Sequence, residues 1–116
     1  MRPFNKDNYF SSLNKIVTEE TKNFFNKSIL ITGANGLIGG TLLDFFLFLN
    51  SEYQANISLS VVVRSHLDVH DFFRNQVINQ MIQSIEEPIH FASDLDYIFH
   101  AASNAHPKAY DLYPVE

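Results

Sequence analysis

The chain has 116 residues, which is enough for one small domain and too few for two. Hydrophobic residues make up 46% of it and charged residues 18%, a composition typical of a chain that folds around a core and not of a disordered one. The formal net charge is −5 and the sequence has no basic cluster, which argues against binding to nucleic acid or to an anionic membrane surface.

The amino-acid sequence also indicates the cellular compartment in which the protein is expected. Cysteine is absent, which excludes disulfides and thiolate metal sites and suits the cytoplasm. Residues 1–10 lack the apolar stretch of a signal peptide. The longest apolar run, residues 42–49, is interrupted by Asp44 and is too short to span a bilayer. We therefore expect a cytoplasmic protein that does not interact with membranes.

An N-terminal helical extension is predicted over residues 1–27, ahead of a domain over residues 28–116. Apolar residues recur there at spacings of three and four, the pattern of one face of a helix. They are Tyr9, Phe10, Leu13, Ile16, Val17 and Phe24. We expect one or two helices that pack on the domain.

Residues 29–40, with the sequence ILITGANGLIGG, are the most informative stretch of the chain. Residues 29–32 suit a buried strand, and a glycine-rich turn and a helix follow. Gly33 allows a sharp turn, Gly36 lets the backbone approach a bulky anion, and Gly39 lets the helix lie close to the sheet. The N–H groups of the helix N-terminus favour the same anion. The stretch predicts a site for the pyrophosphate of a dinucleotide, and the alternative is a plain strand-to-helix loop.

The helix after this turn is predicted over residues 37–49, and Asn50 and Ser51 are expected to end it. Its predicted sheet-facing residues are Ile38, Leu42, Phe45, Phe46 and Leu49. Its other faces are also largely apolar, which is typical of a helix that is buried on more than one side. The N-terminal helices, or a partner, would supply the second cover.

Strands and helices alternate along the rest of the chain. We predict strands at residues 57–63, 81–85 and 97–102 and a helix at residues 68–76. This alternation predicts an α/β fold, a Rossmann-type doubly wound parallel sheet of about four strands in the order 3-2-1-4. Its ligand would bind at the carboxyl ends of the strands.

Two motifs together resemble a known family. They are residues 32–39 (TGANGLIG) and residues 94–103 (DLDYIFHAAS). The pair resembles the extended short-chain dehydrogenase/reductase family, the NAD-dependent epimerases and dehydratases of nucleotide sugars, over about residues 28–116. Residues 100–110 are most similar to its UDP-glucuronate decarboxylase and dTDP-glucose 4,6-dehydratase branch. The resemblance implies NAD or NADP as cofactor and a nucleotide sugar as substrate of the full-length enzyme.

The resemblance also implies a set of cofactor-binding residues. The turn residues that would surround the pyrophosphate are Gly33, Asn35, Gly36, Leu37, Ile38 and Gly39. Ser84 and Ile85, at the end of the third strand, would border the adenine. Ala101 and Ala102 would line the wall beside the ribose and the nicotinamide. Asp96 would help to hold the fourth-strand region together.

Arg64, directly after the second strand, bears on the choice between NAD and NADP. An acidic residue at this place accepts hydrogen bonds from the ribose hydroxyls, whereas an arginine pairs with a 2′-phosphate. Arg64 favours NADP, while the sugar-nucleotide branch mostly uses NAD. A solvated charge at the strand end is a third interpretation, and the sequence leaves all three open.

The family's catalytic Tyr-x-x-x-Lys pair is missing. No tyrosine in the sequence has a lysine four positions later. The residues at that spacing from Tyr9, Tyr53, Tyr97 and Tyr110 are Leu13, Ile57, Ala101 and Pro114, and for Tyr113 the position would be 117, which the given sequence does not include. We therefore predict no catalytic residue in this chain, and expect it to be the N-terminal portion of a longer enzyme, inactive alone. The alternatives are a non-catalytic nucleotide-binding or interaction module and an inactive remnant. An exposed sheet edge would favour self-association.

Three histidines are candidate metal ligands or bases. His66 and His70 have the i, i+4 spacing of a metal pair, but no third ligand is near in sequence, so we interpret them as solvated loop residues. We predict no metal site. His100 is interpreted as a packed or hydrogen-bonded residue of the fourth strand.

Overall fold

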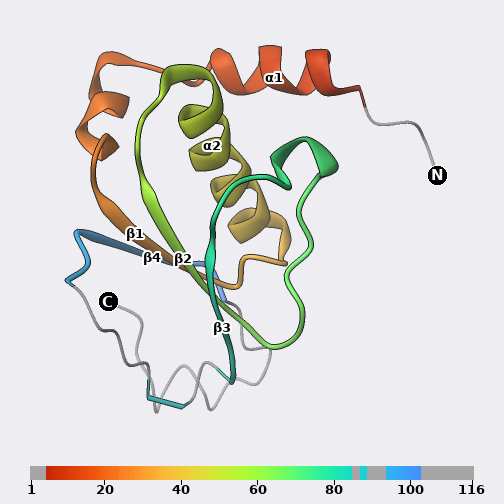
Figure 1. The fold of residues 1–116 in the computed structure, drawn as a ribbon, viewed down its shortest axis with the longest axis vertical. Helices are drawn as coiled ribbons and strands as arrows, with labels where there is room; N and C mark the ends of the chain where they lie inside the picture. Colours follow the sequence, from red (N-terminus) through yellow and green to blue (C-terminus); the bar gives the residue numbers. More distant parts are fainter. Residues whose placement is uncertain (1–4, 85–86, 89–93, 103–116) are drawn as a thin grey trace.

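Four parallel strands and one long helix make up the centre of the molecule (Figure 1). The computed structural model describes residues 5–84, 87–88 and 94–102. The elements in chain order are α1 (Lys6–Asn14), the 3-10 helix η1 (Glu19–Phe24), β1 (Ser28–Thr32), α2 (Leu37–Tyr53), β2 (Ser58–Val63), the 3-10 helix η2 (Asp71–Phe73), β3 (Asn79–Ile82) and β4 (Tyr97–His100).

The sheet has the order β3-β2-β1-β4, and all three pairs are parallel. Ile29 of β1 lies opposite Leu59 of β2 on one side and Tyr97 of β4 on the other. Residues 29–32 of β1 are all buried although successive side chains point to opposite faces of the sheet, which accounts for the uninterrupted apolar run. The predicted Rossmann-type α/β sheet and its strand order are confirmed.

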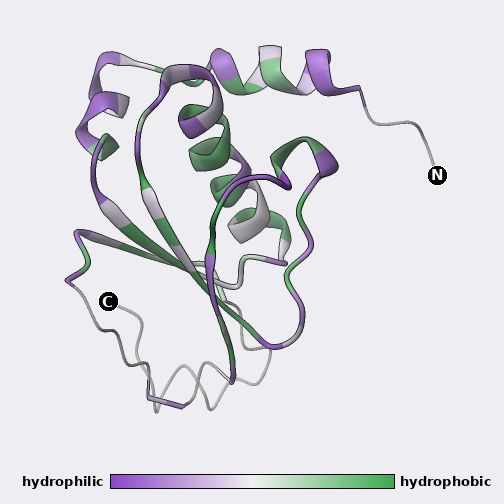
Figure 2. Ribbon diagram, in the orientation of Figure 1, coloured by the Kyte–Doolittle hydropathy of each residue, from purple (hydrophilic) through white to green (hydrophobic). Residues whose placement is uncertain are grey.

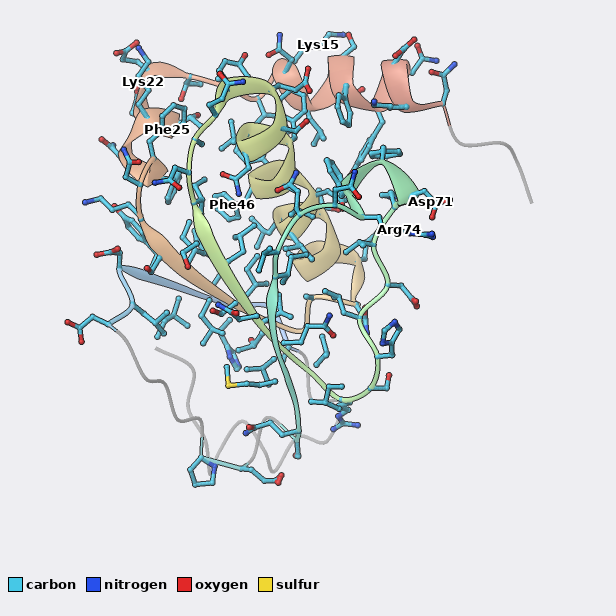
Figure 3. All side chains as sticks on the ribbon, in the orientation of Figure 1. Lys15, Lys22, Phe25, Phe46, Asp71 and Arg74 are labelled. Carbon is cyan, nitrogen blue, oxygen red and sulfur yellow. The ribbon has the colours of Figure 1, made fainter. Side chains whose placement is uncertain are left out.

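Helix α2 covers one face of this sheet (Figure 2). Phe46 lies between the helix and the strands (Figure 3). The buried residues of α2 are Gly39, Leu43, Phe46, Leu47, Phe48 and Leu49. The predicted sheet-facing stripe was therefore only partly right: Phe46 and Leu49 are buried, whereas Ile38 is 70% exposed. Leu43 and Leu47, which were not predicted to face the sheet, are buried, because the buried face of the helix starts at Gly39, where α2 contacts the glycine turn.

The end of α2 also differs from the prediction. The helix continues past Asn50 and Ser51 to Tyr53 and ends at Gln54, which has the left-handed backbone conformation with φ +47°. Asn50 does not cap the helix end. Its side chain instead binds the backbone N–H and C=O of Ile57, at 2.8 and 3.0 Å, just before β2.

The N-terminal elements pack on α2, and η1 also contacts β4. Leu13 of α1 is 2% exposed, and the Phe10 ring meets the Phe48 ring edge-on with centroids 5.0 Å apart. Phe24 of η1 contacts the rings of Phe46 and Phe99 at 5.3 and 6.0 Å. These contacts provide the second cover that the apolar sequence of α2 requires.

Two predicted elements were wrong or misplaced. Residues 68–76 form no α-helix; the three-residue η2 is the helical element there, because so short a segment gains more from burying Phe73 than from helical hydrogen bonds. The third strand begins at Asn79 and ends at Ile82, two residues earlier than predicted at its start. Asn79 and Gln80 are exposed, and such polar residues are tolerated in β3 because it lies at the edge of the described sheet.

None of the helices in the described ranges could span a lipid bilayer.

Candidate functional site

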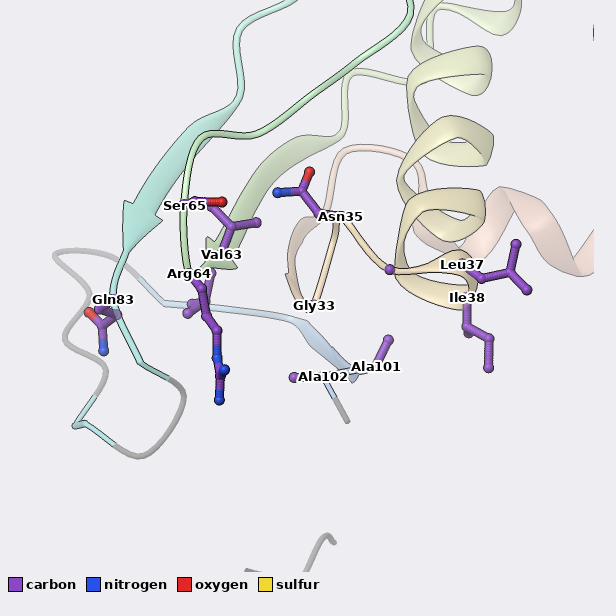
Figure 4. A pocket seen from close by; sticks show the side chains of 12 residues that line it. Gly33, Asn35, Leu37, Ile38, Val63, Arg64, Ser65, Gln83, Ala101 and Ala102 are labelled. Carbon is purple, nitrogen blue, oxygen red and sulfur yellow. The ribbon is translucent and has the colours of Figure 1, made fainter. Parts of the chain in front are cut away.

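A cavity of about 460 Å³ opens at the carboxyl ends of β1 and β2, beside the start of α2 (Figure 4). It is lined by Gly33, Asn35, Gly36, Leu37, Ile38, Val62, Val63, Arg64, Ser65, Gln83, Ala101 and Ala102. This is the place at which parallel α/β sheets bind their ligands, because the strand order reverses there. β1 has β2 on one side and β4 on the other, so the chain crosses in opposite directions from this point.

Gly33 makes the turn that leaves β1. Its φ is +72°, a conformation that side chains disfavour, and a Cβ atom there would lie 2.6 Å from the backbone of Ala102. Its N–H donates to the carbonyl of Val62 at 3.1 Å. The turn is thus fixed between β2 and the residues after β4.

Gly36 and Gly39 have different tasks. Gly36 precedes α2 in an extended conformation, and a Cβ atom there would meet only the Gly33 carbonyl oxygen, at 3.3 Å. Gly39 does not line the cavity: a Cβ atom there would lie 2.7 Å from the Gly33 carbonyl carbon and closer still to its oxygen. Gly39 therefore allows the helix to approach the turn, while Gly36 leaves the ligand side open.

The N-terminus of α2 faces this cavity, which Gly36, Leu37 and Ile38 line. The N–H of Gly36 donates to the Gly33 carbonyl, and among the described residues no side-chain hydrogen bond caps the start of α2. The first N–H groups of an α-helix have no partner inside the helix and carry a positive partial charge. This end can therefore bind an anion.

Thr32 and His100 hold the opposite wall in place. The Thr32 hydroxyl lies 3.0 Å from Nδ1 of His100 and accepts the N–H of Ala102 at 3.2 Å. The N–H of Ala101 donates to the Thr32 carbonyl at 3.1 Å. The interpretation of His100 as a hydrogen-bonded strand residue is confirmed. These hydrogen bonds place Ala101 and Ala102 next to Gly33, and their small side chains leave room in the cavity on this side.

Asp96 has a similar role at the other end of β4. Its N–H donates to the Ser28 carbonyl, and its carboxylate accepts the Ser28 N–H, both at 2.8 Å. The backbone and side chain of one residue thus align β4 with β1, as the resemblance implied.

Asn35 connects the glycine turn to the segment after β2. Its Nδ2 donates to the carbonyl of His66 at 2.9 Å, and its Oδ1 accepts the N–H of Asp68 at 3.1 Å. In Figure 4 its side chain extends from the turn towards the β2 side of the cavity. The amide is therefore engaged with protein backbone.

Arg64 and Ser65 form the wall beyond β2, and both are exposed. In Figure 4 the Arg64 side chain extends from the end of β2 along the opening. Within residues 5–84, 87–88 and 94–102 it has neither an ion-pair nor a hydrogen-bond partner. None of the described residues neutralises its charge, so the guanidinium can bind an anionic ligand.

Ser84 and Ile85 were expected to border the adenine. Gln83 lines the cavity, Ser84 is not among the described lining residues, and β3 ends at Ile82. Ile85 lies outside the described residues. Sequence reasoning missed Val62, Val63, Ser65 and Gln83, although their position at strand ends was a usable signal.

The described lining contains one ionisable side chain, that of Arg64, and no carboxylate. Asp68 lines a separate cavity of about 290 Å³ together with Asp44 and His70. The site can therefore hold an elongated anion between helix dipole and guanidinium, but its described residues include no general acid or base.

A second polar cluster lies on the other side of α2, outside this cavity. Tyr9 donates to the Asp44 carboxylate at 2.6 Å, and His70 Nε2 lies 3.4 Å from the same oxygen. Burial and the adjacent carboxylate raise the pKa of Tyr9, and burial raises the pKa of Asp44 although Tyr9 and His70 oppose it. The prediction that His70 is merely solvated is thus incomplete. No group of metal ligands occurs among the residues that the structure describes.

Comparison with known protein families gives a match. The model of the family described as "NAD dependent epimerase/dehydratase family" matches residues 29–116, most of the chain. No curated protein and no solved structure gives a significant match. The matched range begins in β1 and includes the glycine turn, Arg64 and the residues after β4.

Proposed function

The chain belongs to the NAD-dependent epimerase/dehydratase family, and from this premise we propose that its cavity binds NAD or NADP as the cofactor-binding portion of a nucleotide-sugar epimerase, dehydratase or decarboxylase. The main support for this proposal is that one cavity is lined both by the glycine turn and by the start of α2, where Gly36 provides no capping side chain. A pyrophosphate would bind to the helix N-terminus next to Gly36, with the nicotinamide side along Ala101 and Ala102.

Calorimetric titration of the chain with NAD, NADP and ADP tests this proposal. We expect saturable binding of at least one dinucleotide and weaker binding of ADP, which contains the pyrophosphate and adenosine alone. A sample that is folded by circular dichroism and binds none of the three would contradict the proposal.

Within this function we propose a preference for NADP. Arg64 is exposed at the cavity without a partner among the described residues, and the described lining holds no carboxylate that would accept the ribose hydroxyls. The nearest carboxylate along the chain, Asp68, lines another cavity. A guanidinium binds a phosphate through charge-assisted hydrogen bonds, which contribute about 1.5–3 kcal/mol.

Replacement of Arg64 separates the two cofactors. We expect Arg64→Ala to weaken NADP binding roughly 10- to 100-fold, which corresponds to the energy of such bonds, and to change NAD binding less than threefold. Arg74→Ala is the matched control, because Arg74 is exposed in the same crossover but pairs with Asp71 outside the cavity. Equal binding of NAD and NADP by the wild type would contradict the preference.

The substrate class rests on the resemblance to nucleotide-sugar enzymes of this family. In such enzymes hydride passes from the sugar to the nicotinamide, and a tyrosine with its lysine partner acts as the base. This sequence contains no Tyr-x-x-x-Lys pair. We therefore expect no dehydratase, decarboxylase or epimerase turnover from the chain alone, and measurable turnover would contradict this expectation.

A non-catalytic role in association is the second candidate, and the β4 edge favours it. β4 is an outer strand of the described sheet, and Ile98 on it is 61% exposed. Unpaired strand edges with apolar side chains promote pairing between chains. We expect concentration-dependent self-association in sedimentation velocity, reduced by Ile98→Lys; a monodisperse monomer at all concentrations would contradict it.

A further inference from the structure

The segment after β2 has few connections of its own. Residues 64–70 form no helix or strand until η2 begins at Asp71, and of residues 64–68 only Leu67 is buried, at 4% exposure. In the described part of the chain, the hydrogen bonds that reach residues 65–68 come from the Asn35 side chain. One residue of the glycine turn thus anchors the segment that carries Arg64.

Asn35 accomplishes this across 31 and 33 residues of sequence, with a donor and an acceptor on the same amide. The two bonds restrain both the position and the direction of the backbone at residues 66–68, since an N–H and a C=O point at one planar group. Arg64 lies two residues before the first bonded position. Arg64 itself follows Val63, which is buried and accepts the N–H of Gln83, and the later residues are held by Leu67, Val69 and His70. Without the Asn35 anchor, the backbone of residues 65–68 would have no hydrogen bond among the described residues to fix it relative to the turn.

We propose that Asn35 is a positioning residue for NADP. Its side chain keeps the guanidinium of Arg64 at a fixed distance from the start of α2, so that one dinucleotide can place its pyrophosphate and its 2′-phosphate on both at once. This inference rests on the proposed function and deepens it. A preorganised pair of anion sites binds more tightly because less order has to be created on binding.

The alternative role for Asn35 is direct contact with the cofactor. Its Nδ2 and Oδ1 each have a backbone partner in the structure. A ligand contact would have to break or share these bonds. The indirect role therefore agrees better with the geometry, and it makes a distinct prediction: the effect of Asn35 must pass through Arg64.

A double-mutant cycle tests this dependence. Calorimetry with NADP, NAD and ADP would be carried out on the wild type, Asn35→Ala, Arg64→Ala and the double variant. We expect Asn35→Ala to weaken NADP binding about tenfold and ADP binding less than twofold. In the Arg64→Ala background, adding Asn35→Ala should change NADP binding less than twofold, because the anchored group is already gone.

Asn50 provides a matched control. Its side chain binds the N–H and C=O of a single residue, Ile57, in the same manner, but it lies at the other end of α2, outside the cavity. Asn50→Ala removes the same kind of anchor. We expect it to leave the ratio of NADP to NAD affinity unchanged, even where it lowers the thermal midpoint.

Three results would overturn the inference. They are additive losses in the cycle, equal losses for NADP, NAD and ADP, and the same change of cofactor ratio in Asn50→Ala. Each would arise with a wild type that binds a dinucleotide, so the proposed function would stand. A folded wild type that binds no dinucleotide would overturn the function itself and this inference with it.

Hydrogen exchange supplies a measurement that needs no ligand. The N–H of Asp68 should exchange faster in Asn35→Ala than in the wild type, while amides of β1 keep their protection. An unchanged exchange rate at Asp68 would show that the anchor does not restrain the segment and would also overturn the inference.

Discussion

Gly39 lies so close to Gly33 that a Cβ atom at position 39 would be 2.7 Å from the Gly33 carbonyl carbon. The obstacle is backbone, which cannot rotate away as a side chain can. The first turn of α2 and the turn after β1 are therefore in direct main-chain contact. The position of the helix N-terminus beside the cavity depends on the missing side chain at residue 39.

Gly39→Ala should destabilise the protein by about 3 kcal/mol or more, because the added methyl group forces α2 away from the turn. Gly40→Ala is the control, since its Cβ would lie 3.2 Å from the Ala34 carbonyl oxygen, a contact that needs only a small shift. Both changes gain about 1 kcal/mol of helix propensity. Urea unfolding measures the difference, and equal stabilities would contradict the packing described here.

Gly36→Ala should affect binding without affecting folding. Gly36 has φ −77° and ψ 173°, which alanine adopts without strain, and its Cβ would meet one atom at 3.3 Å. The methyl group would nevertheless occupy the approach to the α2 N-terminus. We expect about tenfold weaker dinucleotide binding and a change in unfolding free energy below about 0.5 kcal/mol. Unaltered affinity in calorimetry would show that no anion approaches this residue.

Phe10→Ala should loosen the N-terminal helix from the domain. The Phe10 ring lies 5.0, 5.3 and 5.7 Å from the rings of Phe48, Phe72 and Phe73. Because the ring is only partly buried, we expect a loss of about 2 kcal/mol, less than for a fully buried phenylalanine. Ile16→Ala, at a residue that is 55% exposed, should cost less than about 0.5 kcal/mol. Similar losses for both would mean that α1 does not pack as described.

Tyr9 should make stability depend on alkaline pH. Burial and the Asp44 carboxylate raise the pKa of its hydroxyl above the ordinary value of 10.0. The folded state therefore keeps the proton longer than the unfolded state, and the Tyr9 contribution is complete below pH 10 and is lost as the pH rises further. Urea unfolding from pH 8 to pH 11 should show a steeper decline for the wild type than for Tyr9→Phe.

The same variant has a consequence at neutral pH. Tyr9→Phe removes a 2.6 Å hydrogen bond to the partly buried Asp44 carboxylate and should cost about 1 kcal/mol, after allowance for the partial exposure of both groups. Parallel pH profiles for the two proteins would contradict the linkage, whatever their difference at pH 7.

The sequence predicted β1, β2, β4 and the glycine turn because their signals are local. The apolar run of β1 and the glycine spacing at 33, 36 and 39 each arise from backbone demands within a few residues. Eight predicted binding residues line the cavity: Gly33, Asn35, Gly36, Leu37, Ile38, Arg64, Ala101 and Ala102.

What the sequence did not reveal depends on contacts between distant segments. The helical pattern at residues 68–76 was misleading because Phe73 is buried from the three-residue 3-10 helix η2, and so short an element can bury an apolar residue as well as an α-helix can. β3 was misplaced because an edge strand accepts polar residues such as Asn79 and Gln80. The anchor from Asn35 to Asp68 spans 33 residues, and no local pattern indicates it.

The parallel pairing of β1 with β4 also affects how the protein is made. Ile29 pairs with Tyr97, so translation must add 68 residues after Ile29 before its outer partner exists. Ala101 and Ala102, which complete the cavity, leave the ribosome later still. During synthesis the glycine turn therefore lacks its β4 neighbour until almost the whole described chain has emerged. Nascent chains should acquire affinity for a dinucleotide abruptly and late, not in proportion to their length.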